Sequence, residues 1–251
     1  MKSDEFTALL NASFGGLGVF SSKDLSCLIE QHFPAISENT IAWKINQLKQ
    51  DGFIFQVGRG LYSLDFLPEY EPSLSLRTKR FINKIDKDKY PNLTVWDTSV
   101  FEHIFHQAFD KSWIFILLPK QNLESLFSDL QSFSKPVFLN PDKATITRYL
   151  LPQTDAVILL PSVSQMPVLT QNSLSIPSIE AILVNIWFDY ERYFPTFSID
   201  LKSLFELSFN KYTINRSKML RYAARRDKRD AIEQKARSKC SKEEIFQRCL
   251  V

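Results

Sequence analysis

The segment LKQDGFIFQVGRGLYSL, residues 48–64, contains two short apolar runs on either side of a Gly-Arg-Gly turn. Apolar runs of this length bounded by glycines are typical of paired strands, so we expect strands over Phe53–Val57 and Leu61–Leu64. The glycines at 58 and 60 permit positive φ, which lets the turn be tight and approach another surface closely. The sequence therefore predicts a β-hairpin that projects Arg59 from its tip, where its guanidinium suits a phosphate or a minor groove.

Helical periodicity precedes this hairpin. We expect a helix over residues 5–12, a short strand at Val19–Phe20, a helix between the Ser21-Ser22 cap and Pro34, and a helix from Ser37 or Asn39 to about Gln50, closed by Gly52. Three helices and a hairpin in this order predict a winged helix-turn-helix domain over residues 1–66, with the third helix in the major groove of DNA.

The third helix has one apolar and one polar face. Ile41, Ile45 and Leu48 share a stripe that must face the core, because residues three and four positions apart lie on the same side of a helix. The other face, with its flank and the hairpin tip, supplies the candidate DNA contacts, which are Asn39, Thr40, Trp43, Lys44, Gln47 and Arg59.

These side chains suit different parts of a duplex. Asn39, Thr40 and Gln47 can pair with base edges in the major groove, whereas Lys44 joins Arg59 as a contact to the backbone or minor groove. Trp43 is the unusual residue on an outward polar face. It either packs on a sugar or a thymine methyl group, or joins two copies on adjacent half-sites.

The remainder of the chain predicts a second domain of the α/β class. Residues 67–75 contain prolines and acids and are expected to form a linker, and residues 76–251 then form an α/β domain with a helical C-terminal part. Continuous apolar strands alternate with amphipathic helices, which is typical of a sheet covered on both faces. The expected elements are a helix at 76–90, strands at 93–96, 113–118, 136–139 and 156–161, helices at 100–107 and 122–133, a hairpin at 166–177, and helices after Pro177 and Pro195.

Charge is distributed unevenly along the chain. Residues 1–65 contain five Lys and Arg against seven acids, so the first domain alone is expected to bind DNA weakly. Residues 216–239 contain ten Lys and Arg against three acids. Four of these cations can share one outward strip of a helix, which are Arg221, Arg225, Lys228 and Arg229. This strip favours binding to a polyanion or to an acidic protein surface. The alternative is a solvated helix end.

The sequence lacks the patterns of common enzyme classes. A restriction-type nuclease needs a carboxylate followed on the next strand by acid-x-lysine, and Asp97 has no such partner. His103 and His106 are three residues apart but no third ligand is near them, so we expect no metal site. Phosphate-loop, dinucleotide and serine-hydrolase motifs are absent. We therefore expect no catalytic residues, no cofactor and no enzyme activity.

The composition also predicts the compartment. The chain is 44% hydrophobic and 24% charged, as in ordinary globular proteins. No apolar run approaches the length of a membrane span, and the acidic start is not expected to act as a signal peptide. Three scattered cysteines do not form a disulfide framework. A cytoplasmic location without membrane contact is expected.

From Ser21 to Asp230 the order of features resembles the AbiE-type antitoxins, transcriptional regulators of bacterial type IV toxin–antitoxin systems that act in abortive infection, a phage defence. The motifs that carry the resemblance are the hairpin at 48–64, VWDTSVFEHIFHQ, PSIEAILVNIWFD and RSKMLRYAARRDKRD, with GRGLY and LRYAARR the most specific. By position, the resemblance implies DNA contacts at Thr40, Lys44, Gln47 and Arg59.

The resemblance also implies a function. Such an antitoxin represses its own operon by binding double-stranded DNA repeats in the promoter. Its C-terminal domain counters a nucleotidyltransferase-like toxin without a stable complex between the two. The alternative is a protein-interaction module, in which the winged helix and the basic C-terminal helix bind a protein partner in place of DNA.

Overall fold

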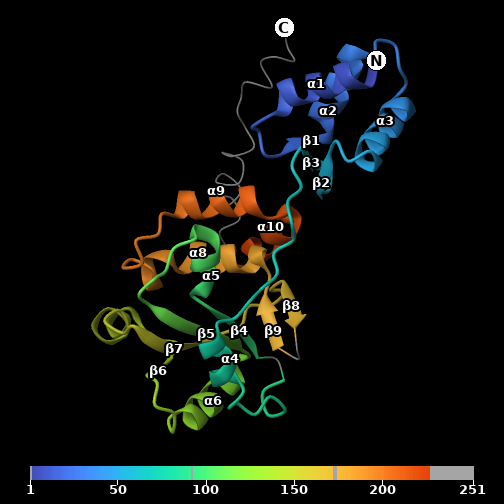
Figure 1. The fold of residues 1–251 in the computed structure, drawn as a ribbon. Coiled ribbons are helices and arrows are strands. Elements are labelled where there is room, and N and C mark those ends of the chain that lie inside the picture. The colour runs from blue at the N-terminus through green and yellow to red at the C-terminus, as the bar shows by residue number, and fades with distance from the viewer. Residues whose placement is uncertain (1, 92, 172–173, 227–251) are drawn as a thin grey trace. The chain divides into compact units, whose positions relative to one another are not determined.

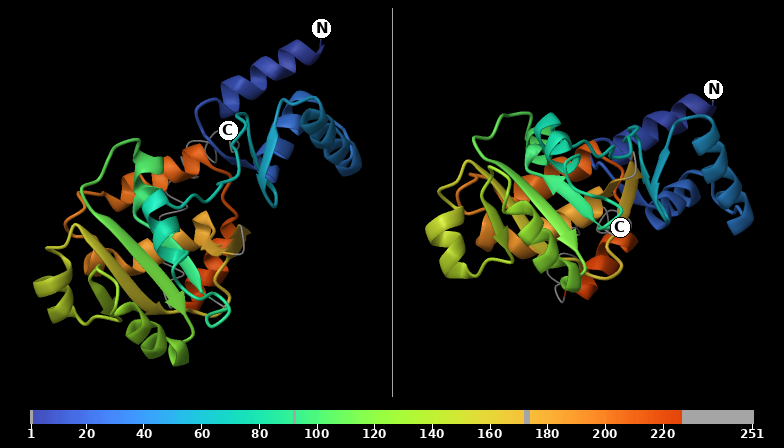
Figure 2. Two further views of the ribbon diagram at one scale, coloured as in Figure 1. Left: turned by 60° about the horizontal axis from the view of Figure 1, so that its bottom comes forward. Right: turned by 90° about the horizontal axis from the view of Figure 1, so that it is seen from below.

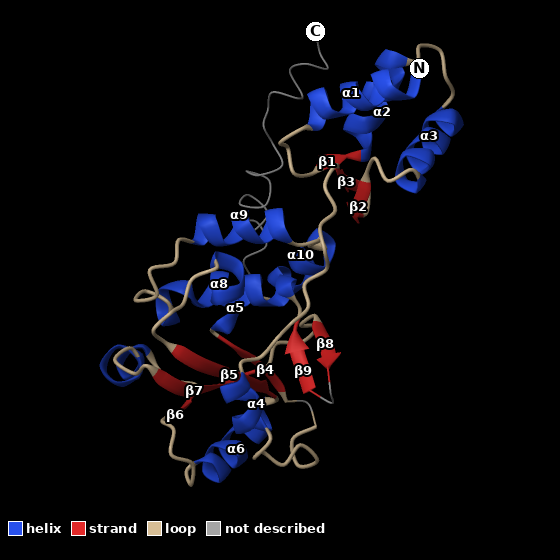
Figure 3. Ribbon diagram, in the orientation of Figure 1, coloured by secondary structure: helices blue, strands red, loops and turns tan. Residues whose placement is uncertain are grey.

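The computed structural model describes residues 2–91, 93–171 and 174–226 (Figure 1). The described chain divides into two compact units. Unit 1 contains residues 2–69 and 208–216, and unit 2 contains residues 70–207 and 217–226. Both helices and strands occur in each unit, so the chain belongs to the mixed α/β class that the sequence predicts (Figure 3).

Unit 1 contains three helices and a small antiparallel sheet. The elements follow in the order α1 (Lys2–Phe14), β1 (Phe20–Ser21), α2 (Ser22–His32), α3 (Glu38–Gln50), β2 (Phe55–Gly58) and β3 (Leu61–Ser63). The strands pair in the order β1-β3-β2, so the short strand between α1 and α2 adds to the outer side of the hairpin (Figure 3). The helices and the hairpin expected from the sequence are all present.

Local signals determine the helix ends of unit 1. Ser21 caps α2 in a reciprocal capping box with Asp24, in which each side chain accepts a hydrogen bond from the other residue's backbone N–H. Gly52 has φ 75° just after α3, the left-handed conformation expected of a helix-closing glycine. The apolar faces enclose a core in which the rings of Phe14 and Phe20 stack with centroids 4.1 Å apart.

The segment predicted as a linker, residues 67–75, contains ordered contacts. The backbone N–H of Thr213 donates to the carbonyl of Pro68, and its hydroxyl donates to the carbonyl of Leu67. Tyr70 and Leu74 are buried. The segment is extended, the boundary between the two units falls within it, and the carbonyls of Leu67 and Pro68 pair with Thr213, a residue distant in the sequence.

Unit 2 contains a mixed six-stranded sheet in the order β6-β7-β5-β4-β9-β8. Its strands are β4 (Thr94–Asp97), β5 (Ser112–Leu118), β6 (Val137–Leu139), β7 (Asp155–Pro161), β8 (Val168–Gln171) and β9 (Leu174–Pro177). β7 pairs in parallel with β5 and β6, and β4 pairs in parallel with β9, while β4–β5 and β8–β9 are antiparallel.

Helices cover both faces of this sheet, as Figures 1 and 2 show. On one face α4 (Leu76–Ile82) and α6 (Leu123–Leu130) pack on alternate strand residues such as Ile116 and Leu159. On the other face lie α5 (Ser99–Phe105) and α8 (Ile179–Tyr193), and Phe115 contacts the ring of Phe194. The alternation of the strand side chains thus fills two cores, as expected for a doubly covered sheet.

The remaining elements are short or lie near the C-terminal end. They are a 3₁₀ turn at Lys120–Asn122, α7 (Lys143–Thr145), a π-helical turn at Ile146–Leu150, α9 (Leu201–Lys211) and α10 (Arg216–Arg225). The helix expected over 76–90 ends at Ile82, and further along the chain the Asp86 carboxylate accepts the backbone N–H groups of Asp88 and Lys89 and forms a turn. Across the described part of the chain, every helix is too short or too polar to cross a lipid bilayer.

Candidate nucleic-acid interface

The start of α3 determines what the candidate residue Thr40 can do. Ser37 is the N-cap of α3, and its hydroxyl accepts a hydrogen bond from the backbone N–H of Thr40 at 3.3 Å. The two hydroxyl groups also hydrogen-bond each other at 2.9 Å. Thr40 is half-buried in this cap, so its side chain stabilises the helix start in the unbound protein.

The outer face of α3 forms an exposed ridge. Ile41, Ile45 and Leu48 are buried against the core of unit 1, as predicted. Asn39, Trp43 and Gln47 lie four residues apart along the opposite side, and all three are exposed, Trp43 by 61%. We call these three residues the α3 ridge. It brings together two side chains that can read base edges and one large aromatic ring.

Lys44 lies beside the α3 ridge and has an intramolecular partner. Its Nζ atom stands 3.8 Å from the centroid of the Phe33 ring, at the distance of a cation–π contact. Both residues line a pocket of about 260 Å³, which Phe6 and Gln47 also border. Lys44 is therefore half-buried, and its ammonium group lies over the Phe33 ring in the unbound protein.

The hairpin turn holds Arg59 at a defined place. Gly60 has φ 68°, whereas Gly58 keeps an ordinary φ, so only one of the two glycines adopts the left-handed conformation. The carbonyl of Gly60 accepts a hydrogen bond of 2.8 Å from the backbone N–H of Ser22 at the start of α2. This bond attaches the turn to the body of unit 1, and Arg59 is exposed beside it.

A chain of polar side chains connects α3 with the hairpin turn. Lys49 Nζ donates to Gln56 Oε1 at 2.8 Å, and Gln56 Nε2 donates to the carbonyl of Gly58 at 3.1 Å. Neither Lys49 nor Gln56 is among the site residues predicted from the sequence. Their outward positions, at the end of the third helix and in the first strand of the hairpin, were the available signal. Their contacts connect the end of α3 with the turn that carries Arg59.

The basic C-terminal strip is only partly described. Arg221 and Arg225 are exposed on α10, and Arg225 donates to Gln165 at 3.1 Å. Lys228 and Arg229 lie outside the described residues. Arg226, which the strip did not include, is half-buried and pairs with Asp189 at 3.1 Å. Of the four predicted cations, the structure therefore describes Arg221 and Arg225, and both are exposed.

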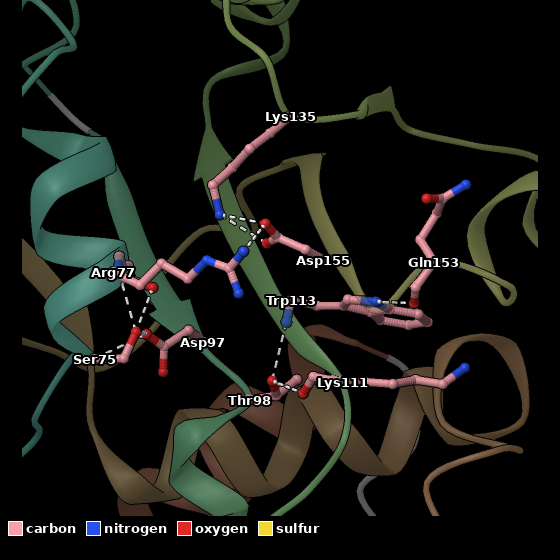
Figure 4. Close-up of polar contacts among 10 residues, drawn as sticks. Ser75, Arg77, Asp97, Thr98, Lys111, Trp113, Lys135, Gln153 and Asp155 are labelled. Carbon is pink, nitrogen blue, oxygen red and sulfur yellow. Dashed lines mark hydrogen bonds and ion pairs between the residues drawn. The ribbon is translucent and has the colours of Figure 1, made fainter.

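Asp97, which the sequence analysis tested as a nuclease carboxylate, stabilises two helix starts. One carboxylate oxygen accepts the backbone N–H and hydroxyl of Ser75, the N-cap of α4, at 3.0 and 2.8 Å (Figure 4). The other accepts the backbone N–H of Ser99 at 3.1 Å. His103 Nε2 hydrogen-bonds Ser73. Among the residues that the structure describes, no three His, Cys, Asp or Glu side chains gather as metal ligands.

Comparison with known proteins gives one match. Residues 40–242 match a family described as a family of unknown function, DUF6577. This range begins in α3 and includes the hairpin and unit 2. No curated protein and no solved structure matches the chain.

Proposed function

Because the chain belongs to the DUF6577 family, whose description states no function, we propose its function from the geometry of unit 1. The proposal is that unit 1 is a winged helix-turn-helix domain that binds double-stranded DNA. The order α1-β1-α2-α3-β2-β3 and the sheet order β1-β3-β2 support it, since a helix pair followed by a hairpin is the arrangement in which the second helix of the pair reads the major groove.

One observation gives the main support for this proposal. The α3 ridge and Arg59 are exposed on adjoining elements of unit 1, which the contact between Lys49 and Gln56 joins. Asn39 and Gln47 present amide groups that can bond adenine in the major groove, and Arg59 presents five donors that suit a phosphate or a narrow minor groove. Trp43 supplies apolar area for a sugar or a thymine methyl group.

The biological role follows from the resemblance of the sequence to AbiE-type antitoxins. We propose that the protein is a transcriptional autorepressor that binds repeats in its own promoter. In this role it acts as the antitoxin of a type IV system, and unit 2 counters a nucleotidyltransferase-like toxin without a stable complex. A cytoplasmic location belongs to the same proposal.

The test is a gel-shift titration of the full chain with DNA from upstream of its own coding region. Arg59→Ala should weaken binding to every sequence, by roughly 8-fold at 0.1 M salt, and reduce the salt slope by about 0.9, because one phosphate contact is lost. Gln47→Ala should instead relax the preference for one base position. Lys143→Ala removes the same charge as Arg59→Ala from an exposed site on α7 of unit 2 and serves as the control. Equal affinity of wild type and Arg59→Ala would remove the hairpin from the interface.

A protein-interaction module is the second candidate, and exposed aromatic side chains favour it. Trp43 is 61% exposed and Phe66 is 70% exposed, and the net charge of residues 1–65 is negative. A module of this kind would show no specific shift with upstream DNA at either low or moderate salt. It would instead retain a protein partner whose binding is lost in Trp43→Ala. The DNA titration at two salt concentrations therefore separates the two candidates.

A further inference from the structure

Unit 2 contains a basic groove that neither the DNA-binding proposal nor the sequence analysis uses. It lies between α4 and the segment after α6, and its volume is about 490 Å³. Four cationic side chains line it, which are Arg77, Arg80, Lys84 and Lys135. We call these four residues and the space between them the α4 groove. Among the described residues, no acidic side chain lines it.

The carboxylate of Asp155 organises one end of the α4 groove. It pairs with Arg77 at 2.5 Å and with Lys135 at 2.7 Å (Figure 4). Asp155 is mostly buried, whereas the Arg77 side chain remains 56% exposed. A single carboxylate thus holds two cations in place and neutralises only one charge, so this end of the groove keeps a net positive charge and free guanidinium donors.

The other cations extend the positive surface along α4. Arg77 and Arg80 are three residues apart, and Lys84 follows in the turn after the helix, so the three span about 10 Å at about 1.5 Å per residue. A nucleic acid strand advances about 3.4 Å per nucleotide, so the span corresponds to roughly three phosphates. Arg80 and Lys84 are exposed and have no ion-pair partner among the described residues.

The aromatic residues of the groove belong to the protein core. Phe81 is buried, and Phe133 is half-buried and packs against the sheet core. Lys84 and Lys135 stand 5.9 Å from the ring centroids of Phe133 and Phe81, at the outer limit of a cation–π contact. Leu76 is the exposed apolar side chain of the groove. Protein partners usually bind through buried aromatic anchors, which this groove does not offer, whereas a phosphate backbone requires only cations.

We propose that the α4 groove binds the sugar–phosphate backbone of nucleic acid without sequence preference. This site is on unit 2 and does not depend on whether unit 1 reads a specific operator. In it Arg77 and Arg80 bond phosphate oxygens through their guanidinium groups, and Lys84 and Lys135 contribute charge. The groove supplies the phosphate neutralisation that the acidic composition of residues 1–65 does not provide.

The experiment measures binding of the full chain to a fluorescein-labelled 20-base-pair duplex of random sequence, by anisotropy at several salt concentrations. It uses the background Gln47→Ala/Arg59→Ala, so that unit 1 contributes little. Adding Arg80→Glu/Lys84→Glu should weaken binding by roughly 10- to 100-fold at 0.1 M salt and reduce the salt slope by about 1.8, the value for two phosphate contacts. The control Lys120→Glu/Lys143→Glu changes the net charge equally at exposed residues that do not line the groove.

Three results would overturn the proposal. The first is random-duplex affinity unchanged by Arg80→Glu/Lys84→Glu. The second is an equal loss in the control, which would show that only net charge matters. The third is a chain that binds labelled polyglutamate but not DNA, with polyglutamate binding lost in Arg80→Glu/Lys84→Glu. The groove would then bind an acidic protein. Circular dichroism verifies that each variant is folded. If Arg80→Glu/Lys84→Glu does not fold, Arg80→Gln/Lys84→Gln replaces it, with a smaller expected loss of DNA affinity. Failure of the operator proposal leaves these results unchanged, since random DNA is the probe.

Discussion

Trp43 offers the most direct quantitative test of the α3 ridge. A tryptophan side chain buries about 150–250 Å² when fully covered, and the 61% exposure of Trp43 leaves roughly 90–150 Å² of this area in water. Covering that area is worth about 2–4 kcal/mol at about 25 cal/mol per Å². Trp43→Ala should therefore weaken DNA binding by up to roughly 30- to 700-fold, with the upper values requiring complete burial.

The same substitution should leave the fold intact. Because Trp43 is exposed, Trp43→Ala is expected to change the free energy of unfolding by less than about 0.5 kcal/mol. Fluorescence then reports the contact directly. Trp96 and Trp113 are buried and Trp187 is half-buried, so acrylamide should quench Trp43 preferentially, and saturating upstream DNA should protect it. Trp43→Phe removes this signal but retains an aromatic ring and most of the affinity, which assigns the protection to Trp43.

Two results decide the role of Trp43. If Trp43→Ala binds upstream DNA as tightly as wild type and DNA does not change acrylamide quenching, the ridge does not contact DNA and the reasoning is refuted. Sedimentation without DNA tests the other role proposed for this residue. A dimer in wild type that becomes a monomer in Trp43→Ala would show that Trp43 joins two copies of the chain.

Three further predictions follow from the interior and the hairpin turn. Gly60→Ala should lower the free energy of unfolding by about 1–2 kcal/mol, because φ of Gly60 is 68° and the new Cβ would stand 3.2 Å from Ser22 Oγ. In thermal unfolding, the control Gly58→Ala should lose less stability, because φ of Gly58 is ordinary. Tyr193→Phe should be neutral or stabilising in urea denaturation, since the buried hydroxyl of Tyr193 has no partner among the described residues. Tyr222→Phe should instead lower the free energy of unfolding by about 1 kcal/mol, because a hydrogen bond to Asn185 is lost. A larger loss of stability in Tyr193→Phe than in Tyr222→Phe would contradict this prediction. Burial raises the pKa of the Tyr222 hydroxyl above 10.0, so the contribution of Tyr222 to stability is complete below pH 10 and is lost as the pH rises through the raised pKa. Absorbance at 295 nm should therefore show the ionisation of Tyr222 together with alkaline unfolding. Tyr222→Phe should unfold at a higher pH than wild type.

Local sequence signals predicted unit 1 well because each acts within a few residues. The cap at Ser21, the left-handed Gly52 and the hairpin around residues 58–60 depend on backbone preferences of the residues themselves. Burial of Ile41 and Ile45 follows from helical periodicity alone. The exposure of the candidates Asn39, Trp43 and Gln47 follows from the same periodicity, since they lie opposite the buried stripe.

Contacts between distant residues could not be predicted in this way. Periodicity places Lys44 on the flank of α3, but its position over the ring of Phe33 depends on how α2 and α3 pack. The pairing of Thr213 with Pro68 joins residues far apart in the chain, and no local pattern marks it. The α4 groove likewise combines α4 with the segment that contains Lys135. Lysines and arginines in the printed sequence predict charge, but only the fold shows which of them share a groove.

The division of charge between the two units has a consequence for specificity. Phosphate contacts weaken steeply with salt, whereas hydrogen bonds to base edges carry little salt dependence. If base edges are read by the α3 ridge and most phosphate contacts come from the α4 groove, raising the salt concentration removes affinity mainly through the groove. The ratio of operator to random-DNA affinity should then change little, while both affinities decrease. In Arg80→Glu/Lys84→Glu both affinities should fall by a similar factor and the ratio should stay near its wild-type value, since the sequence-independent contribution is lost from both complexes while Asn39 and Gln47 remain in place.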